Sequence, residues 1–560
     1  MSWIQKLYET YEQCAGHEPE GFEPLMPICH STQQAQIEIV LDGNGGFKRA
    51  SVIEKTHGTT LIPCTESSAG RAGSKPVNHP LCDKLQYVAK DFVVFGGEVT
   101  SGFAKEPDVP HQDYLVGLRA WTASEWSHPK LTAILNYVEK GSVVQDLVTA
   151  GILPLGEDGK LLKSWSNEAN PAPAIFKVIQ NTQAPEDAFV RWRVESAPDD
   201  PLTATWQDQS LIDSWVAYYQ RTQALFGICM VTGQESALAT QHPAKLRHAG
   251  DKAKLISAND SQNFTYRGRF TSKEEAFAVG NETSQKAHNA LKWIIRKQGT
   301  FFDTMTIVTW ESNQLSMPKW ERDTEAIVSE YEREYVGNAE DDWEDDWSTE
   351  EIVSDGNPIT ADKFYKALRG YGKKIDNTSN MILLAFDAAT PGRLALIENQ
   401  ELNSVRYLKN IEKWHNDCNW IHTKWKDGER IQFAGMIGVK DIADILYGIE
   451  NKGTVSIVDA NGKKLYAQVA QRLLPCIWNG TRVPYDYVML AVSKASNPLA
   501  YKERRNWERV LTLACSFVKK DKKDRYKEEW NVALDKKETD RNYLYGRLLA
   551  VADRIDPTGR

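Results

Sequence analysis

The sequence predicts an α+β fold with several domains, in which a mixed N-terminal body of β-hairpins and sheets precedes a C-terminal α-helical bundle. The chain has 560 residues, which is longer than a single hydrophobic core usually supports. In the first part of the chain, apolar residues alternate with period two around glycine turns. From about residue 433 onward, helical spacing dominates instead.

Composition places the chain among globular proteins, because 41% of its residues are hydrophobic. No run approaches about eighteen apolar residues, so we expect no membrane span. The N-terminus has the character of an amphipathic helix rather than a signal peptide. The eight cysteines form no C-x-x-C pair, which favours reduced, mostly buried thiols in a cytoplasmic protein.

The net charge of −9 hides an uneven distribution. Residues 321–355 contain fifteen acidic residues and two arginines, and subtracting their charge of −13 leaves +4 for the other 525 residues. A cationic body with one acidic insertion is compatible with a polyanionic partner. The acidic segment itself is either a solvated linker or a surface that mimics nucleic acid or docks a basic partner.

The N-terminal elements follow from short patterns. Ser2 and Gln5 predict a capping box at the start of a first helix. Residues 37–41 and 47–53 flank a glycine turn and predict a hairpin, and residues 59–63 predict a further strand. Residues 81–92 have a helical pattern.

A loop rich in small residues covers residues 67–79 and includes Arg71 and Lys75. Small residues around each cation let the backbone approach a ligand closely, as phosphate-binding loops do. The loop matches no Walker pattern, so nucleotide hydrolysis is not indicated. The alternative is an ordinary surface loop.

Residues 189–194 alternate with period two, so Val190, Trp192 and Val194 are predicted to pack inward. Arg191 and Arg193 then project from the opposite face of the sheet. They could follow a nucleic-acid backbone or belong to a solvated sheet face.

The most informative stretch is basic and runs from Cys229 to about Gly299. Between Lys245 and Lys297 there are eleven Lys/Arg residues and five Asp/Glu residues. Amides, hydroxyls and the two aromatic residues Phe264 and Tyr266 lie between the cations of this stretch. This mixture suits phosphate contacts from cations, base contacts from amides and stacking by aromatic residues. The alternative is a solvated loop with ordinary surface lysines.

The remaining elements are a helix over residues 283–297, a hairpin formed by residues 381–386 and 393–397, and helices near the C-terminus. The cation-rich residues 519–527 could follow a nucleic-acid strand or form a solvated helix face. A group formed by His415, Cys418 and His422 would share one helical face, but zinc normally needs a fourth ligand and no partner motif is present. With no catalytic motif either, we expect no enzyme, no cofactor and no metal.

An ordered set of segments resembles one known family, the large subunit of the type I-C (Dvulg subtype) CRISPR surveillance complex, Cascade. The resemblance is carried along the whole chain by residues 3–11, 61–71, 81–88, 189–194, 229–233 with His242-Pro243, and 543–551. No single motif is diagnostic, but the ordered set is specific.

The resemblance implies a non-catalytic role in a crRNA-containing Cascade with backbone subunits, a subunit that binds the 5′ handle, and small subunits. The large subunit would recognise the PAM in double-stranded DNA, help to open the duplex, guide the displaced non-target strand and dock the helicase-nuclease. Protein then reads a short PAM, and guide pairing reads the remaining sequence.

Carried over to this chain, the resemblance assigns three groups of residues. The predicted PAM contacts come from the small-residue loop and from an amide-rich loop: Arg71, Ser74, Lys75, Asn78, Asn259, Gln262, Asn263 and Tyr266. The predicted contacts to the DNA backbone are Lys245, Arg247, Lys252, Lys254, Arg267, Arg269, Arg191 and Arg193. The predicted path of the non-target strand follows Lys519, Lys520, Lys522, Lys523 and Arg525.

Met436 is the expected start of an internally translated small subunit, because family members are thought to produce one from their C-terminal part. The expected divisions are 1–228, 229–320 (DNA recognition), 321–355 (acidic linker), 356–435 and 436–560 (helical bundle). Two other functions stay open: a protein scaffold of a ribonucleoprotein that does not read DNA, and a metal-dependent nuclease.

Overall fold

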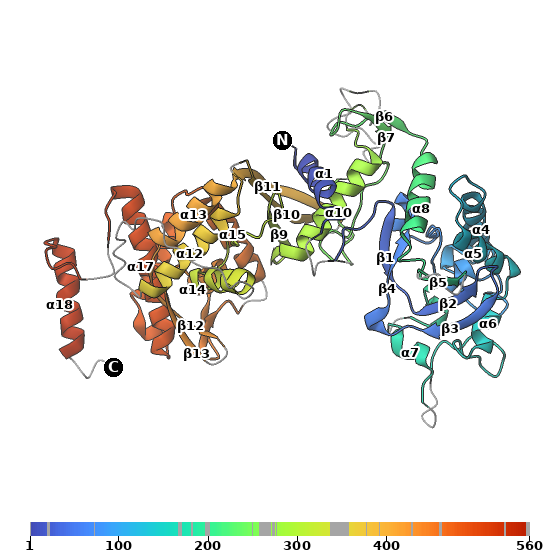
Figure 1. Cartoon of the computed structure of the whole chain (residues 1–560). Helices are drawn as coiled ribbons and strands as arrows, with labels where there is room; N and C mark the ends of the chain where they lie inside the picture. The colour runs from blue at the N-terminus through green and yellow to red at the C-terminus, as the bar shows by residue number, and fades with distance from the viewer. Residues whose placement is uncertain are drawn as a thin grey trace. The chain divides into compact units, whose positions relative to one another are not determined.

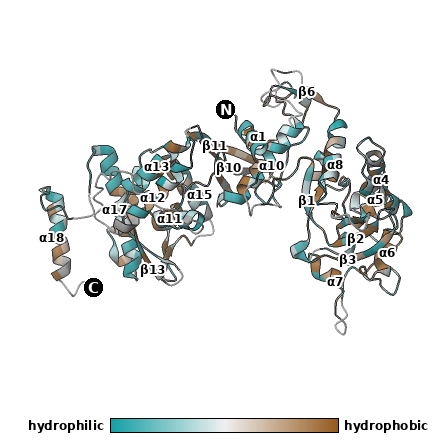
Figure 2. Cartoon of the chain, in the orientation of Figure 1, coloured by the Kyte–Doolittle hydropathy of each residue, from teal (hydrophilic) through white to brown (hydrophobic). Residues whose placement is uncertain are grey.

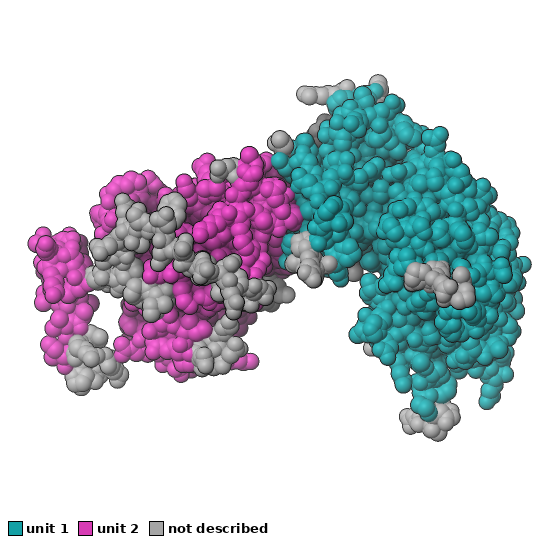
Figure 3. All heavy atoms as spheres, viewed as in Figure 1, with its two compact units in different colours: residues 1–297, 388–396 teal, residues 298–387, 397–560 magenta. Residues whose placement is uncertain are grey.

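The computed structural model contains two compact units, coloured separately in Figure 3. Unit 1 comprises Met1–Lys297 and Ala388–Leu396, and unit 2 comprises Gln298–Asp387 and Ile397–Arg560. Each unit combines helices and small sheets, which confirms the predicted α+β class. The structure describes residues 2–18, 23–71, 73–165, 171–180, 183–196, 202–248, 250–256, 270, 275, 277–336, 358–376, 378–390, 392–426, 429–458, 462–530 and 534–555.

A three-stranded sheet forms the centre of unit 1 (Figure 1). Strand β2 (Ile37–Asp42) pairs antiparallel with β3 (Phe47–Val52) and parallel with β5 (Val190–Glu195). The predicted hairpin and the predicted strand near residue 190 are therefore confirmed. Trp192 is fully buried and packs edge-on against the Tyr137 ring, with ring centroids 6.0 Å apart.

Helices pack on this sheet and extend unit 1. Helix α5 (Pro129–Lys140) contacts both β2 and β5, and α4 (Val109–Thr122) packs against α5. A separate pair is formed by β1 (His30–Gln34) and β4 (Thr59–Pro63), which run antiparallel. The smaller elements of this part are η1 (Lys55–His57), α2 (Glu66–Ala69), α3 (Leu85–Val88), η2 (Ser101–Phe103), α6 (Val143–Thr149), α7 (Ala174–Val178), η3 (Pro185–Asp187) and α8 (Gln209–Arg221).

The prediction of one helix over residues 81–92 is wrong, because only Leu85–Val88 are helical. Asp83 interrupts the pattern: its carboxylate accepts the backbone N–H of Lys84, and its carbonyl accepts the N–H of Val190. Apolar side chains on both sides of this segment are buried, so burial rather than helical periodicity explains the pattern.

The N-terminal helix α1 (Trp3–Cys14) begins where it was predicted, but the capping box is wrong. The Ser2 side chain makes no capping hydrogen bond, and the Gln5 amide donates instead to Glu9 Oε1 at 3.0 Å. The predicted helix near residue 290 is confirmed as α10 (Asn281–Gln298). Before it, β6 (Phe226–Ile228) and β7 (Glu235–Ala237) form a short antiparallel ribbon.

Unit 2 is organised around a sheet with the strand order β11-β10-β9-β8. Its strands are β8 (Thr300–Phe302), β9 (Met305–Glu311), β10 (Asn380–Thr390) and β11 (Arg393–Asn403), and the last two are the predicted hairpin. Figure 2 shows that β10 is hydrophobic over much of its length, consistent with its buried residues 381–386.

Helices share a core with this sheet, and unit 2 also contains two further hairpins. Phe433 lies in a strand of the first hairpin rather than at the start of a helical region. The second hairpin follows helix α14 (Val439–Tyr447). Met436 is fully buried within this core, so the predicted boundary at residue 436 falls inside one hydrophobic cluster. The elements are α12 (Pro358–Lys373), α13 (Ser404–Asp417), β12 (Trp420–Lys426), β13 (Glu429–Gly435), α14 (Val439–Tyr447), β14 (Ile449–Asn451), β15 (Thr454–Ser456), α15 (Gly462–Trp478), α16 (Tyr485–Ala495), η6 (Pro498–Ala500), α17 (Arg504–Tyr526) and α18 (Arg541–Ile555).

The beginning of the acidic segment is folded into unit 2. Helix α11 (Thr324–Tyr331) buries Ile327 completely and continues into the π-helix η5 (Glu332–Val336). Residues 337–357 lie outside the described residues, so the linker prediction for them stays a prediction. Among the described residues, no helix is both long enough and apolar enough to cross a membrane.

Candidate nucleic-acid interface

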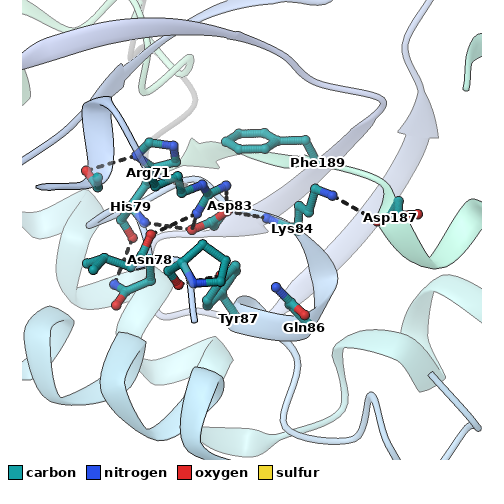
Figure 4. A network of polar contacts seen from close by, with 12 residues as sticks. Arg71, Asn78, His79, Asp83, Lys84, Gln86, Tyr87, Asp187 and Phe189 are labelled. Carbon is teal, nitrogen blue, oxygen red and sulfur yellow. Dashed lines mark hydrogen bonds and ion pairs between the residues drawn. The ribbon is translucent and has the colours of Figure 1, made fainter. Parts of the chain in front are cut away.

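The small-residue loop is closed by a buried ion pair between Arg71 and Asp83 (Figure 4). Both guanidinium nitrogens Nη1 and Nη2 donate to the Asp83 carboxylate at 2.7 Å. The same carboxylate accepts the backbone N–H of His79 at 2.6 Å and that of Lys84 at 2.7 Å. Burial alone would lower the pKa of Arg71, but the facing carboxylate raises it, so the guanidinium stays charged.

Further contacts fix the loop backbone and leave its tip at the surface. The Tyr87 hydroxyl donates to the Pro76 carbonyl at 2.7 Å, and the Gly102 N–H donates to the Ser74 carbonyl at 3.1 Å. The Ser74 and Lys75 side chains are exposed, and the Lys75 ammonium lies 3.9 Å from a Glu106 carboxylate oxygen. The loop therefore presents a hydroxyl and an ammonium from an anchored backbone.

Asn78 and His79 complete the base of this loop. Asn78 is partly buried, and its amide donates to the His79 carbonyl at 3.1 Å. The His79 ring is fully buried, and its Nδ1 lies 3.1 Å from the Ser68 hydroxyl. Burial, together with Arg71 and Lys245, holds the pKa of His79 well below its usual range, so the ring is neutral.

The basic segment forms a tight turn next to this loop. The Lys245 N–H donates to the Asp251 carbonyl at 2.8 Å, and Lys245 has a left-handed backbone with φ +59°. Arg247 donates to the Asp251 carboxylate at 2.8 Å, which closes the turn a second time. Lys254 then pairs through its backbone with Gly392 and Leu394, which also belong to unit 1.

Glu66 joins the two segments. Its carboxylate accepts the backbone N–H groups of Thr240 and Gln241, each at 3.1 Å, and the Asn281 amide at 2.5 Å. Glu66 opens α2 just before the small-residue loop, whereas Thr240 and Gln241 lie within the basic segment and Asn281 opens α10. Two regions about 170 residues apart in sequence are thus held together, which local patterns do not predict.

Four lysines around this junction have no ion-pair partner in the part of the chain that the structure describes. They are Lys245, Lys252, Lys254 and Lys292. Lys252 is exposed, and the other three are partly buried. Burial lowers the pKa of Lys245, and the charges of Arg71 and Lys252 lower it further. We did not predict Lys292 as a contact, because a single lysine in an amphipathic helix reads as an ordinary surface residue.

Six predicted contacts lie outside the described residues. They are the amide-rich loop with Asn259, Gln262, Asn263 and Tyr266, and the two cations Arg267 and Arg269.

The sheet-face arginines have partners within unit 1. Arg191 and Arg193 each donate through Nε to the Glu38 carboxylate at 2.9 Å, and their guanidinium carbons lie 3.9 and 5.2 Å from the centroid of the Trp206 ring. Arg191 is only 8% exposed. Burial would raise the pKa of Glu38, but the two arginines lower it overall. In this conformation, both side chains bind Glu38 on the neighbouring strand β2. Their predicted contact with DNA stays a prediction.

The cations proposed for the non-target strand lie on α17, and most have partners in unit 2. Lys520 is 1% exposed and lies 3.3 Å from Asp417 and 3.2 Å from Asp524. Lys523 pairs with Asp417 at 3.0 Å. Lys519 donates to the Asn419 carbonyl, Arg525 pairs with Asp521, and the Lys522 ammonium lies 4.7 Å from the centroid of the Tyr526 ring.

The expectation that His415, Cys418 and His422 share one helical face is wrong. Helix α13 ends at Asp417, and His422 lies in strand β12. All three side chains are buried: His415 Nδ1 lies 2.7 Å from the Thr324 hydroxyl, and His422 Nε2 lies 3.1 Å from the Ser516 hydroxyl. Among the described residues, no three His, Cys, Asp or Glu side chains gather as metal ligands would. All eight cysteines are free thiols, and seven of them are buried.

The fold is that of an α+β protein, and lysines without ion-pair partners in the described residues lie around the junction at Glu66. Residues 7–558 match the family described as CRISPR-associated protein (Cas_Csd1), and the chain belongs to this family. It is therefore a CRISPR-associated protein of the Cascade large-subunit type. No curated protein shows significant sequence similarity to it. The resemblance found in the sequence is confirmed at the family level, and the type I-C subtype stays a prediction.

Proposed function

We propose that this chain is the large subunit of a type I-C Cascade and recognises the PAM in double-stranded DNA. The observation that carries the proposal is the junction at Glu66, which sets the anchored small-residue loop beside lysines without ion-pair partners. A cation without a carboxylate partner is available to a phosphate, and a fixed loop can meet a base edge with little loss of entropy.

The contacts divide between two roles. Lys75, Ser74 and Asn78 supply donors for base edges, while Lys245, Lys252 and Lys254 supply charge for the DNA backbone. Arg71 acts through the loop, because its guanidinium already makes a bidentate pair with Asp83. The amide-rich residues Asn259, Gln262, Asn263 and Tyr266 stay assigned to base contacts on sequence grounds.

The remaining parts of the proposal concern partners. The chain assembles with crRNA-bound backbone subunits, helps to open the duplex, guides the displaced strand and docks the helicase-nuclease. Family membership supports a place in a CRISPR complex, and it supports these separate tasks only by analogy.

The decisive experiment measures duplex-DNA binding by the chain assembled with its crRNA complex, using targets that differ only in the flanking base pairs. We expect affinity to depend strongly on the flank. Lys75→Ala should weaken the preferred target by about 1–3 kcal/mol and reduce the preference among flanks.

A matched control is Lys55→Ala, which removes an exposed lysine of unit 1 outside the two segments. It should leave both affinity and preference unchanged. Equal affinity for all flanks in the unaltered complex would reject PAM recognition. If the complex also failed to bind duplex DNA at low salt, the chain would act as a protein scaffold instead.

A further inference from the structure

Lys292 lies on α10, a helix that the basic segment contacts through His242. His242 Nδ1 lies 2.7 Å from the Ser284 hydroxyl, and the His242 and His288 rings stack with centroids 6.0 Å apart. Ser284, His288 and Lys292 follow one another at four-residue spacing, so they share one face of the helix. Lys292 therefore continues the helix face that His242 contacts.

Two other lysines lie around the same position. Lys245 and Lys292 both act on the buried Cys64 thiol, whose pKa burial raises to about 12 although the two ammonium groups lower it. Lys254 and Lys292 both contribute to the low pKa of His288, after burial and His242. Lys292 thus stands in the electrostatic neighbourhood of both Lys245 and Lys254.

No neighbouring group balances this charge. In the described part of the chain, no carboxylate oxygen lies within ion-pair distance of Lys245, Lys254 or Lys292. A thiol with a pKa of about 12 is neutral at physiological pH, so Cys64 provides no counterion. Glu66 reaches Lys254 only at longer range, and its oxygens already accept hydrogen bonds from Thr240, Gln241 and Asn281.

Two other buried or partly buried lysines of unit 1, Lys286 and Lys130, do have carboxylate partners. Lys286, on the same helix, lies 2.6 Å from Glu12 and 2.5 Å from Glu282, and these carboxylates raise its pKa although burial opposes them. Lys130 lies 2.6 Å from Asp208. Burial lowers the pKa of Lys292 to about 8, the opposite direction from Lys286. Desolvating an ammonium without a partner costs free energy that an anionic ligand would recover.

We propose that Lys245, Lys254 and Lys292 form a binding site for a phosphate group, in which Lys292 is the central residue. The proposal rests on the function proposed above, because the adjacent small-residue loop would bring the backbone of a DNA strand to this site. The phosphate is then a phosphodiester of that strand. A free phosphate offers the same chemistry, so the test must separate the two sources.

The test compares Lys292→Gln with Lys297→Gln, a lysine on the same helix whose ammonium lies 4.9 Å from the Trp293 ring centroid. In the assembled complex, Lys292→Gln should weaken duplex binding about tenfold and reduce the slope of log affinity against log salt by about one, with flank preference retained. Lys297→Gln should change neither quantity.

Thermal unfolding of the isolated chain gives a second readout. Lys292→Gln should raise the Tm, because it removes a charge that has no partner, so stability and DNA affinity should move in opposite directions. A residue with a merely structural role would lower both.

Inorganic phosphate distinguishes the source of the ligand. If about 10 mM phosphate raises the Tm of the unaltered chain but not of Lys292→Gln, while DNA binding is equal in both, the site takes a free phosphate. If neither DNA binding nor the phosphate response differs between Lys292→Gln and the unaltered chain, the proposal is overturned. If the unaltered complex shows no preference among flanks, PAM recognition is rejected. The phosphate site is not rejected by that result, since a phosphate contact is independent of base sequence.

Discussion

Arg71 and Asp83 meet through two parallel hydrogen bonds of 2.7 Å, and the Asp83 side chain is fully buried. This pair converts a glycine- and serine-rich stretch into a fixed loop, because Asp83 also holds the backbone N–H of His79. The ion pair fixes the conformation of the loop, whereas burying an ion pair contributes little net stability. Removing one partner is different, because the other charge is then buried alone.

Replacing Arg71 with Ala should therefore destabilise unit 1 by about 3–5 kcal/mol, because Asp83 would lose its counterion. Thermal or urea unfolding of the full chain measures this effect. Lys48→Ala is the control: Lys48 pairs with Glu195 at the surface, and such pairs contribute at most about 1 kcal/mol. If Arg71→Ala proved as mild as Lys48→Ala, the loop would not depend on this ion pair.

The fold of unit 1 shows which features the sequence could predict and which it could not. Local patterns predicted the hairpin of β2 and β3 and the inward face of β5, because alternation and glycine turns are properties of neighbouring residues. The parallel pairing of Ile37 with Val190 joins distant segments, and no local pattern contains it. The predicted helix at residues 81–92 failed for a related reason, since the Asp83 side chain competes with the helix for backbone N–H groups.

The candidate site was predicted in part. Composition identified the small-residue loop and the basic segment. Composition does not show which cations are paired with carboxylates and which are available to a phosphate. The structure shows that Arg71, Arg191 and Arg193 are engaged by carboxylates, whereas Lys292 is not. Whether a cation is free depends on carboxylates distant in sequence, such as Glu38 for Arg191, so charge counting along the chain cannot separate the two kinds.

The α17 cations give a second stability prediction. Lys520→Met should cost about 1–3 kcal/mol, because the almost completely buried Asp417 carboxylate loses one of its two ion-pair partners among the described residues and keeps Lys523. Lys522→Ala is the control, since the Lys522 ammonium lies over the Tyr526 ring and has no carboxylate partner within the described residues. Chemical unfolding of both variants tests this. Equal stability of the two variants would mean that unit 2 does not depend on the ion pairs of Lys520.

Buried histidines make stability depend on pH. Burial lowers the pKa of His422 to about 3, although a backbone contact with Gly435 opposes it. The unfolded chain takes up a proton at this residue near pH 6.5, so its contribution to stability is complete above that pH and is lost as the pH falls toward 3. From about pH 7 to about pH 5, the loss is about 2 kcal/mol.

Comparing the unaltered chain with His422→Gln isolates the contribution of His422 to the pH dependence of stability. Glutamine does not titrate and can place an amide near the Ser516 hydroxyl, which lies 3.1 Å from His422 Nε2. The Tm of the variant should therefore fall less steeply with decreasing pH. Parallel curves for the two proteins would show that His422 is not held neutral by the fold.

Lys292 should make DNA binding sensitive to pH in the alkaline range. Its pKa of about 8 follows from burial, with Cys64 raising it and Arg296 and Lys245 lowering it. Burial also lowers the pKa of Lys245 and Lys254, and His288 is neutral above pH 7. A phosphate binds the charged form, so affinity should fall as the pH rises through about 8, by up to about tenfold per pH unit. Lys292→Arg keeps its charge at these pH values, so its binding should fall less steeply with rising pH than that of the unaltered complex. The measurement is duplex affinity of the assembled complex from about pH 7 to about pH 9. Identical pH profiles for the two proteins would exclude Lys292 from the phosphate contact, whatever the affinity at neutral pH.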